Sequence, residues 1–211
     1  MNSVLVAILA AGESRRMGAP KLCLPWKGTT VLGHQLAQWR EAGAEKIVVV
    51  HAPDTAAPVV RELDRLGVPA YERAASIAFE RGMMGSVITA AGRAVADASL
   101  THLVIALGDQ PHLRPETLRE MLQSCERHPG KIIRAVFEGQ PGHPLALPAI
   151  LLAELSTTPC ATLRDFLGLQ NSPVFDLTCP DSGVLLDMDT PDDYARATSA
   201  DLSSSRENSP L

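Results

Sequence analysis

The feature that most constrains the fold is a short apolar run, Val4–Leu9, that passes directly into a basic, glycine-containing loop. The run is rich in β-branched residues, which is typical of a buried parallel strand. The following stretch, Leu9–Lys21, reads LAAGESRRMGAPK. Small residues at 10–12 let a ligand approach the backbone, and Gly12 and Gly18 allow positive φ, so successive amides can turn toward an anion. The sequence therefore predicts a strand that leads into an anion-binding loop.

Two cationic side chains, Arg16 and Lys21, accompany those amides. A triphosphate fits this combination, because its oxygens need several convergent donors and its charge must be neutralised before a nucleophile approaches. The loop is not a P-loop, since no Gly-Lys-Ser/Thr closes it, and Gly12 and Gly18 alone do not make the three-glycine dinucleotide fingerprint. An ordinary loop with solvated arginines remains the alternative interpretation.

Apolar runs alternate with helical stripes along the rest of the chain. Strands are expected at 46–50, 69–71, 102–107, 132–137 and 184–186, and helices at 31–39, 59–66, 87–95 and 117–125, with two short helices within 149–169. This alternation predicts a mostly parallel sheet with right-handed crossovers and helices on both faces. In such sheets ligands bind outside the carboxyl ends of the strands, which is where the Leu9–Lys21 loop is expected.

Size and charge limit the class of protein. A chain of 211 residues with 45% hydrophobic residues fits one α/β domain over residues 1–198, followed by a polar tail, 199–211, that is expected to be disordered. The formal net charge of −5, with no long basic run, argues against a nucleic-acid partner. The first apolar run is too short for a membrane anchor or signal peptide, and the four cysteines form no C-x-x-C pair. We therefore expect a cytoplasmic protein with reduced cysteines and no membrane partner.

A carboxylate follows the predicted strand at 102–107, in the sequence Gly108-Asp109-Gln110-Pro111. At the carboxyl end of a buried strand it faces the expected phosphate site, where two anions would repel each other. Magnesium would resolve that conflict, because it prefers oxygen ligands and is often held by one or two carboxylates plus phosphate oxygens. A structural turn aspartate is the alternative interpretation.

A second acidic block reads Asp187-Met188-Asp189-Thr190-Pro191. Asp187 and Asp189 alternate along a predicted strand and so are expected to point the same way. A helix start also explains the block, with Asp189 or Thr190 as N-cap and Pro191 in the first helical position. A cap needs only one of these carboxylates, so the other is free for a metal.

Two further blocks place small or polar residues at predicted turns. Residues 79–87 contain two glycines and a cap at Gly85 or Ser86, so free amides there can meet a base or ribose beside a wall of methionines. A turn over 138–144 is expected to lead into residues 145–147. It contains His143, which either contacts an acceptor substrate or only satisfies backbone groups.

The run LAAGESRRMGAPK resembles the signature of the MobA-like nucleotidyltransferase family, L-A-[AG]-G-x-S-x-R-M-G-x-P-K, and most nearly its molybdenum cofactor cytidylyltransferase branch. Similar blocks occur in the family's order near 79–87, 104–111, 139–147 and 187–194. The resemblance implies a three-layer α/β/α, Rossmann-like nucleotidyltransferase fold, like that of the nucleotide-diphospho-sugar transferases. The stretch 156–164 departs from the family pattern and leaves the acceptor open.

The resemblance also implies roles for individual residues. Nucleotide binding falls to Leu9, Ala10, Ala11, Gly12, Ser14, Arg16, Lys21, Gly82, Met83 and Ser86. The residues implied for catalysis are Arg16, Lys21 and Asp109. Magnesium would be bound by Asp109 and Asp189, with Asp187 in support. Acceptor binding falls to Gly142, His143 and Pro144.

The implied reaction is transfer of a nucleotidyl group from CTP to the terminal phosphate of the molybdenum-pterin cofactor, with release of pyrophosphate. Ala11 favours CTP, because guanylyltransferase relatives usually have glycine there. Other interpretations are GTP as donor, another phosphate or sugar-phosphate acceptor, and a non-catalytic accessory protein that binds the cofactor or a nucleotide. A molybdoenzyme is a possible client. An unrelated enzyme such as a dehydrogenase is disfavoured by the missing dinucleotide fingerprint.

Overall fold

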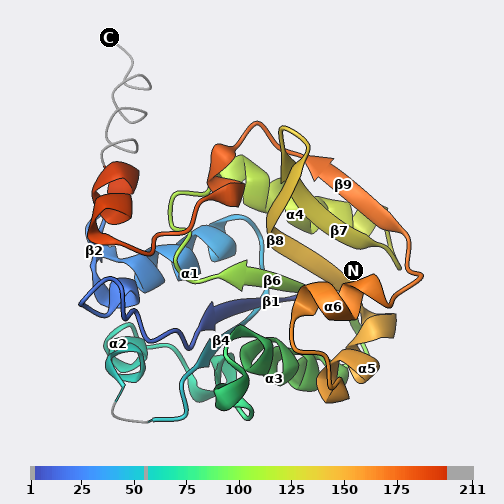
Figure 1. Cartoon of the computed structure of the whole chain (residues 1–211), viewed down its shortest axis with the longest axis horizontal. Coiled ribbons are helices and arrows are strands. Elements are labelled where there is room, and N and C mark those ends of the chain that lie inside the picture. Colours follow the sequence, from blue (N-terminus) through green and yellow to red (C-terminus); the bar gives the residue numbers. More distant parts are fainter. Residues whose placement is uncertain (1–2, 55–56, 199–211) are drawn as a thin grey trace.

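The computed structural model describes residues 3–54 and 57–198, in which a seven-stranded sheet lies between two layers of helices (Figure 1). The sheet consists of β1 (Ser3–Ala10), β4 (Lys46–His51), β5 (Arg73–Ala75), β6 (Leu100–Leu107), β7 (Ile132–Phe137), β8 (Gln140–Pro148) and β9 (Val174–Thr178). The helices are α1 (Val31–Glu41), α2 (Pro58–Arg65), α3 (Met83–Val95), α4 (Pro115–Arg127), α5 (Leu152–Thr157) and α6 (Leu163–Gly168). Residues 191–198 are also helical. The predicted α/β/α layering is confirmed.

Shorter elements connect these. A small hairpin pairs β2 (Pro25–Trp26) with β3 (Thr29–Thr30) before α1. Short 3-10 turns are η1 (Lys21–Cys23), η2 (Ala70–Glu72), η3 (Phe79–Arg81), η4 (Ala149–Leu151) and η5 (Ser182–Leu185). Within the described residues, no helix has the length and apolar character needed to cross a membrane. The predicted tail at 199–211 lies outside the described residues, and the single domain over 1–198 stays a prediction.

The sheet has the order β5-β4-β1-β6-β8-β7-β9 and is mostly parallel, as predicted. β1 pairs in parallel with β4 and β6, and β4 pairs in parallel with β5. β8 runs antiparallel to both of its neighbours, whereas β9 is parallel to β7. The carboxyl ends of β1, β4 and β6 therefore share one edge of the sheet, which is where ligands bind in open α/β sheets.

Alternation along β1 divides the core into two layers. Val6 and Ile8 belong to the cluster packed under α1, α2 and α4, whereas Leu5 and Ala7 face the cluster under α3, α5 and α6. Successive side chains of a strand point to opposite faces, so a strand covered on both faces reads as a continuous apolar run. The run that the sequence singled out is apolar because both of its faces are buried.

Three predictions for the first half of the chain were wrong: the position of a strand, the N-cap of a helix and the burial of one side chain. The third strand is β5, not 69–71, because η2 intervenes after Pro69 and β4 pairs only from Arg73 onward. The N-cap of α3 is Gly82, whose φ of 60° and ψ of −134° suit glycine, and not Gly85 or Ser86. Val95, expected to face inward, is 49% exposed at the end of α3.

Two further differences lie in the second half. β8 begins at Gln140, so the predicted long turn shrinks to Glu138-Gly139, both of which have positive φ, as a two-residue hairpin requires. Residues 184–186 form no strand but belong to or follow η5, because the side chain of Asp181 accepts a hydrogen bond from Gly183 N and favours a turn. β9 was not predicted.

Candidate active site

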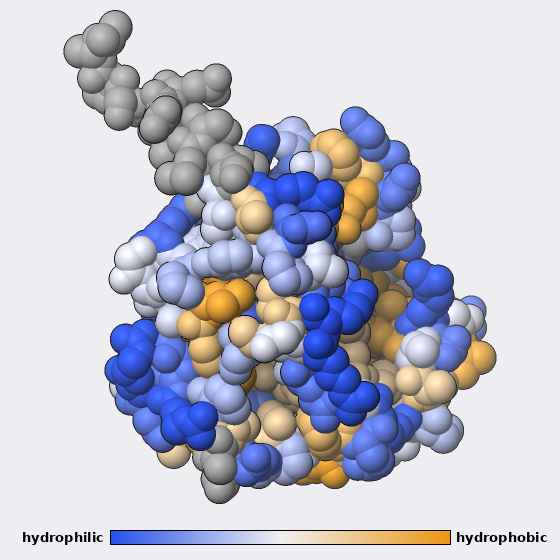
Figure 2. Space-filling view, turned by 60° about the vertical axis from the view of Figure 1, so that its left-hand side comes forward, coloured by the Kyte–Doolittle hydropathy of each residue, from blue (hydrophilic) through white to orange (hydrophobic). Residues whose placement is uncertain are grey.

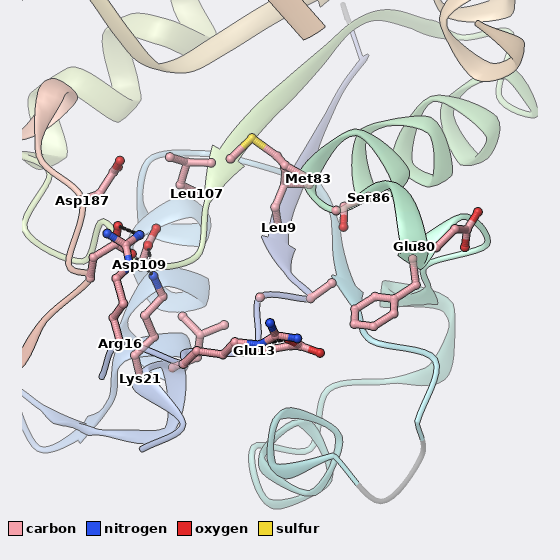
Figure 3. A pocket seen from close by; sticks show the side chains of 17 residues that line it. Leu9, Glu13, Arg16, Lys21, Glu80, Met83, Ser86, Leu107, Asp109 and Asp187 are labelled. Atoms are coloured by element: carbon pink, nitrogen blue, oxygen red, sulfur yellow. Dashed lines mark hydrogen bonds and ion pairs between the residues drawn. The ribbon is translucent and has the colours of Figure 1, made fainter. Parts of the chain in front are cut away.

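A cavity of about 690 Å³ opens at the edge of the sheet where β1 and β6 end (Figures 2 and 3). Three segments line it: the loop after β1, the stretch from η3 into α3, and the carboxylates that follow β6 and η5. The residues predicted for the site that line it are Leu9, Ala11, Gly12, Arg16, Lys21, Gly82, Met83, Ser86, Asp109 and Asp189. Segments that are up to 180 positions apart in the sequence therefore meet as the topology predicts.

The loop after β1 presents its cations to the cavity through a turn centred on Ser14. Ser14 has a φ of 52°, its carbonyl accepts from Met17 N at 3.0 Å, and its Oγ accepts from Lys21 N at 3.2 Å. Met17 is buried in the core and anchors the middle of the loop. The loop thus returns to the protein at Lys21, where η1 begins.

Lys21 joins the two carboxylates that were predicted to hold a metal. Its Nζ donates to Asp109 Oδ2 and, at 2.9 Å, to Asp189 Oδ1, and Arg16 Nη2 donates to Asp189 Oδ2 at 2.5 Å. Figure 3 shows Arg16, Lys21 and Asp109 gathered on one side of the cavity. A lysine ammonium therefore neutralises the predicted metal site.

These contacts shift the titration of both partners. Burial by itself would lower the pKa of Lys21, but the charges and hydrogen bonds of Asp109 and Asp189 outweigh it and leave the pKa above its usual value. The hydrogen bond from Lys21, helped by the charge of Arg16, holds the pKa of Asp189 below its usual value. Lys21 is therefore cationic and Asp189 anionic at neutral pH, which is the pair of forms that favours their attraction.

Asp187 is the carboxylate whose negative charge has the weakest support from neighbouring groups. Burial, and then the charges of Asp109 and Asp189, raise the pKa of Asp187 above its usual value. Gln110 Nε2 donates to Asp187 Oδ1 at a long 3.4 Å. A cation next to Asp187 would relieve this unfavourable concentration of negative charge.

The carboxylates fit a hard divalent cation, since such ions prefer oxygen ligands. Among residues 3–54 and 57–198, no three His, Cys, Asp or Glu side chains stand in a ready-made metal-binding arrangement. This agrees with a site that is completed by phosphate oxygens, because Mg²⁺ is usually held by one or two carboxylates together with its substrate. The donor set at Asp109 and Asp189 therefore fits a metal that binds with the nucleotide.

The opposite wall of the cavity is apolar. Met83, 56% exposed, lies with Leu9 and Ser86 on the side away from the charged cluster, and Leu107 also lines the cavity (Figure 3). Gly85 lies behind this wall, and a Cβ there would stand 1.8 Å from the carbonyl oxygen of Ala78. Gly85 therefore lets the start of α3 approach the preceding turn, which brings Gly82 and Met83 to the cavity.

Ala10 and Ser14 do not line this cavity. They line a second one of about 650 Å³ on the other side of the glycine loop, which shares residues 11–13 and Phe79 with the first. Phe79 and Glu80 were not predicted as site residues, although both line the main cavity. Their position just before Gly82 was the available signal, but neither residue type is characteristic of nucleotide binding.

The three residues predicted for the acceptor lie beside the cavity and do not line it. Gly142 packs against η5, where an added Cβ would stand 1.9 Å from Val184 O. Burial lowers the pKa of His143 below its usual value. A hydrogen bond to the Ile105 carbonyl and the charges of Asp187 and Asp109 act in the opposite direction but do not outweigh burial. His143 Nδ1 is buried without a hydrogen-bond partner among the described residues. The imidazole is thus neutral and close to the carboxylates.

The divergent stretch 156–164 contributes no lining residue to the main cavity. It contacts the site indirectly through Arg81, whose guanidinium donates to Thr158 O at 3.1 Å and Cys160 O at 2.5 Å. Arg81 directly precedes Gly82, so the divergent stretch supports the apolar wall of the cavity. The four cysteines are free thiols, and Cys125 and Cys179 are buried.

Comparison with known proteins gives two relatives that match most of the chain and one that matches part of it. The molybdenum cofactor cytidylyltransferase of Escherichia coli is 25% identical over 219 residues, which cover 93% of this chain and 96% of that protein. The nicotine blue oxidoreductase of Paenarthrobacter nicotinovorans is 28% identical over 193 residues, covering 87% and 90%. A probable molybdenum cofactor guanylyltransferase of Opitutus terrae is 31% identical over 128 residues, covering 61% of this chain but only 58% of that protein.

Solved structures agree with this fold. The structure of Rv0371c from Mycobacterium tuberculosis has a TM-score of 0.73 at 27% identity, covering 94% of this chain and 98% of that one. A nucleotidyl transferase from Methanothermobacter thermautotroptrophicus has a TM-score of 0.77 at 22% identity, covering 97% and 100%, and supports the fold alone. The family of the MobA-like NTP transferase domain matches residues 6–174. Since that match spans most of the chain, from β1 to the start of β9, the protein belongs to the MobA-like NTP transferase family, whose members are nucleotidyltransferases.

Proposed function

We propose that this nucleotidyltransferase transfers a cytidylyl group from CTP to the terminal phosphate of the molybdenum-pterin cofactor and releases pyrophosphate. The observation that carries the proposal is one cavity in which the glycine loop, the Lys21 ammonium and the Asp109 and Asp189 carboxylates meet. A cytidylyltransferase relative matched over 93% of this chain supports the choice of nucleotide and acceptor.

The chemistry requires little covalent participation by the protein. An oxygen of the acceptor phosphate forms a bond to the α-phosphorus, and the bond from that phosphorus to the bridging oxygen of pyrophosphate breaks. A phosphate monoester is already ionised at neutral pH, so no general base is needed. The loop amides near Gly12, together with Arg16 and Lys21, would bind the triphosphate and stabilise the charge that develops on pyrophosphate.

Asp109 and Asp189 would hold magnesium, with Asp187 in support. The ion would supply charge neutralisation at the phosphates when it is bound. Lys21 now neutralises both ligands, so the metal would take over that role and leave the ammonium to the phosphate oxygens. A Mycobacterium tuberculosis structure of similar fold has been solved in complex with manganese.

Ala11 is the residue that supports CTP over GTP. It lines the cavity between Leu9 and Gly12, and its methyl group leaves less room for a base than glycine would. An Ala11→Gly variant should therefore gain activity with GTP relative to CTP. The measurement is kcat/KM for each nucleotide, and an unchanged ratio would remove this part of the proposal.

The acceptor would approach from the β8 side, beside Gly142, His143 and Pro144. His143 supports this because its ring is close enough to feel the charges of Asp187 and Asp109. A neutral imidazole can accept or donate a hydrogen bond to a phosphate or a pterin. Another phosphate or sugar-phosphate acceptor would use the same residues, and a molybdoenzyme would be the client only if the cofactor is the acceptor.

The test is pyrophosphate release by the purified protein with magnesium and CTP, GTP or ATP, with and without molybdenum cofactor. Release from CTP that needs both metal and cofactor is the expected result. Release from GTP instead would overturn the interpretation of Ala11 and keep the mechanism. An Asp109→Asn variant provides the control for contaminating transferases, since its rate should fall by roughly 100- to 1,000-fold.

No release from any nucleotide, with active cofactor confirmed in a control reaction, would favour a carrier without chemistry. The relative named nicotine blue oxidoreductase adds one more outcome to check, because it matches 87% of this chain. Oxidation or reduction of nicotine blue catalysed by the same preparation would support that activity and contradict transfer as the sole function. The full set of Arg16, Lys21, Asp109 and Asp189 supports transfer.

A further inference from the structure

Residues 181–189 carry two of the three carboxylates of the site, yet they belong to no strand. Their regular structure is the short turn η5, after which residues 186–189 have no regular secondary structure. Backbone pairing therefore does not fix where Asp187 and Asp189 stand. Met188, which lies between them in the chain, is 1% exposed in the core, and side-chain hydrogen bonds from elsewhere in the fold act beside it.

The beginning of the segment is fastened by its own carboxylate. Asp181 is 3% exposed, and its Oδ2 accepts from Arg114 N at 2.9 Å and from Thr117 Oγ1 at 2.7 Å. Its Oδ1 accepts from Gly183 N at 2.9 Å. These bonds tie the segment to the amino-terminal end of α4, but they act six residues before Asp187.

The end of the segment is held by Gln110, which directly follows Asp109 in the chain. Gln110 is 1% exposed, and its Nε2 donates to Leu186 O at 3.0 Å and to Asp187 Oδ1 at 3.4 Å. One buried amide therefore joins the loop that carries Asp109 to the segment that carries the other two carboxylates.

We propose that Gln110 is a positioning residue that sets the spacing between Asp109 and the pair Asp187 and Asp189, and so the cation affinity of the site. The part that concerns the cation rests on the proposed function. The part that concerns the segment rests on the hydrogen bonds alone. Residues that orient metal ligands typically change metal affinity by roughly 10- to 100-fold when they are removed.

The chain offers a matched control in Gln38 of α1. Gln38 is 6% exposed, its Nε2 donates to Leu113 O at 3.1 Å, and its Oε1 is buried without a hydrogen-bond partner among the described residues, as is that of Gln110. Gln38 also supports the loop after β6, but it contacts no carboxylate. Gln110→Met and Gln38→Met remove the same kind of bond with a side chain of similar volume.

The experiment measures two quantities on the full chain for the wild type and both variants. Mn²⁺ binding by electron paramagnetic resonance should weaken by roughly 10- to 100-fold in Gln110→Met and stay within threefold in Gln38→Met. Amide hydrogen exchange should quicken at residues 186–189 only in Gln110→Met. Thermal unfolding of both variants checks that their losses of stability are alike.

The outcomes separate this inference from the proposed function. If Gln110→Met matches Gln38→Met in Mn²⁺ affinity and in exchange at 186–189, Gln110 is only a packing residue and the inference is overturned. If the wild type binds no Mn²⁺, the metal site of the proposed function fails, and the exchange comparison alone decides the inference. Faster exchange confined to Gln110→Met would then still support the positioning role.

Discussion

The loop after β1 and the segment 181–189 both bring charged side chains to the cavity, but they are held in different ways. The loop is tied through Ser14, which accepts from Met17 N and Lys21 N, and its Arg15 and Glu13 pair with each other in solvent. The segment is tied by the buried side chains of Asp181 and Gln110. Segments with few buried contacts open at lower free energy than segments fixed in the core.

The contrast teaches how one cavity can combine adaptability with a fixed charge arrangement. Phosphates are bound by several donors whose positions can adjust, which suits the exposed loop. Carboxylates that hold a cation must keep their oxygens in place before the ligand arrives, because preorganised charges need no reorganisation during reaction. The two segments meet at Lys21 and Arg16, the loop residues that contact Asp189, and of these only Lys21 also contacts Asp109.

The largest effect is expected at that meeting point. Lys21→Met removes the cation that would bind the triphosphate, and pyrophosphate release should fall by roughly 100- to 1,000-fold. Lys46→Met is a matched control, because Lys46 pairs with Asp97 outside the cavity. A steady-state rate for Lys21→Met within threefold of that control would show that the segments need not meet through this residue.

The next largest effect tests how firmly the segment is held. Asp181→Ala leaves the donors Arg114 N and Thr117 Oγ1 buried without their acceptor, so the free energy of unfolding should fall by about 2–4 kcal/mol. Asp165→Ala, which removes an exposed N3 carboxylate of the α6 capping box, should cost about 0.5–1 kcal/mol. Urea unfolding measures both, and equal losses would contradict the contrast between buried and exposed ties.

A smaller effect should appear in acid, and part of it should come from His112, whose Nε2 contacts the Gly183 carbonyl in the segment. Burial lowers the pKa of His112, against the opposing Gly183 and Leu186 carbonyls and the charges of Asp181 and Asp109. The unfolded state then binds more protons below about pH 6.5, so this histidine makes stability fall as the pH drops through that value toward the folded pKa.

Urea unfolding at pH 7.5 and 5.0 checks this sign. The wild type should be less stable at pH 5.0, and His112→Asn should narrow the difference between the two values. Residues 9–21 contain no histidine, so amide exchange there, corrected for its intrinsic pH dependence, should not respond. A difference that is just as large in His112→Asn would assign the acid sensitivity to other groups.

The smallest effect is expected in the loop. Ser14→Ala removes the acceptor of Lys21 N in a partly exposed turn, and the loss of stability should be about 0.5 kcal/mol, at the low end for a hydrogen bond. Thermal unfolding is the measurement. A loss as large as that of Asp181→Ala would mean that the loop is fixed as firmly as the segment.

The same contrast explains which parts of the site could be predicted from the sequence. The glycines and Lys21 of the loop, and the position of Asp109 after a strand, are local features of the sequence. The loop and the first carboxylate could therefore be proposed from the sequence. The shape of residues 181–189 was not, because it depends on Gln110, a residue more than 70 positions away that bonds to a backbone carbonyl. The residue types at 181–189 do not indicate such a contact.

The same distinction between local sequence features and structural contacts applies to the fold. Alternating apolar runs were enough to predict the parallel sheet around β1, since both faces of those strands are buried. The boundaries that failed were set by special backbone conformations, such as Gly82 at the start of α3, or by local side-chain bonds, such as Asp181 to Gly183. These are decided by geometry that hydrophobic periodicity does not contain.

Arg81 has a consequence for how this chain can change over evolutionary time. Its guanidinium donates hydrogen bonds to the carbonyl oxygens of Thr158 and Cys160 in the stretch 156–164, and every residue type offers a carbonyl. Substitutions in that stretch can therefore accumulate without loosening the apolar wall of the cavity, provided that the backbone keeps its course. A departure from the family pattern in that stretch is therefore compatible with the same two hydrogen bonds from Arg81.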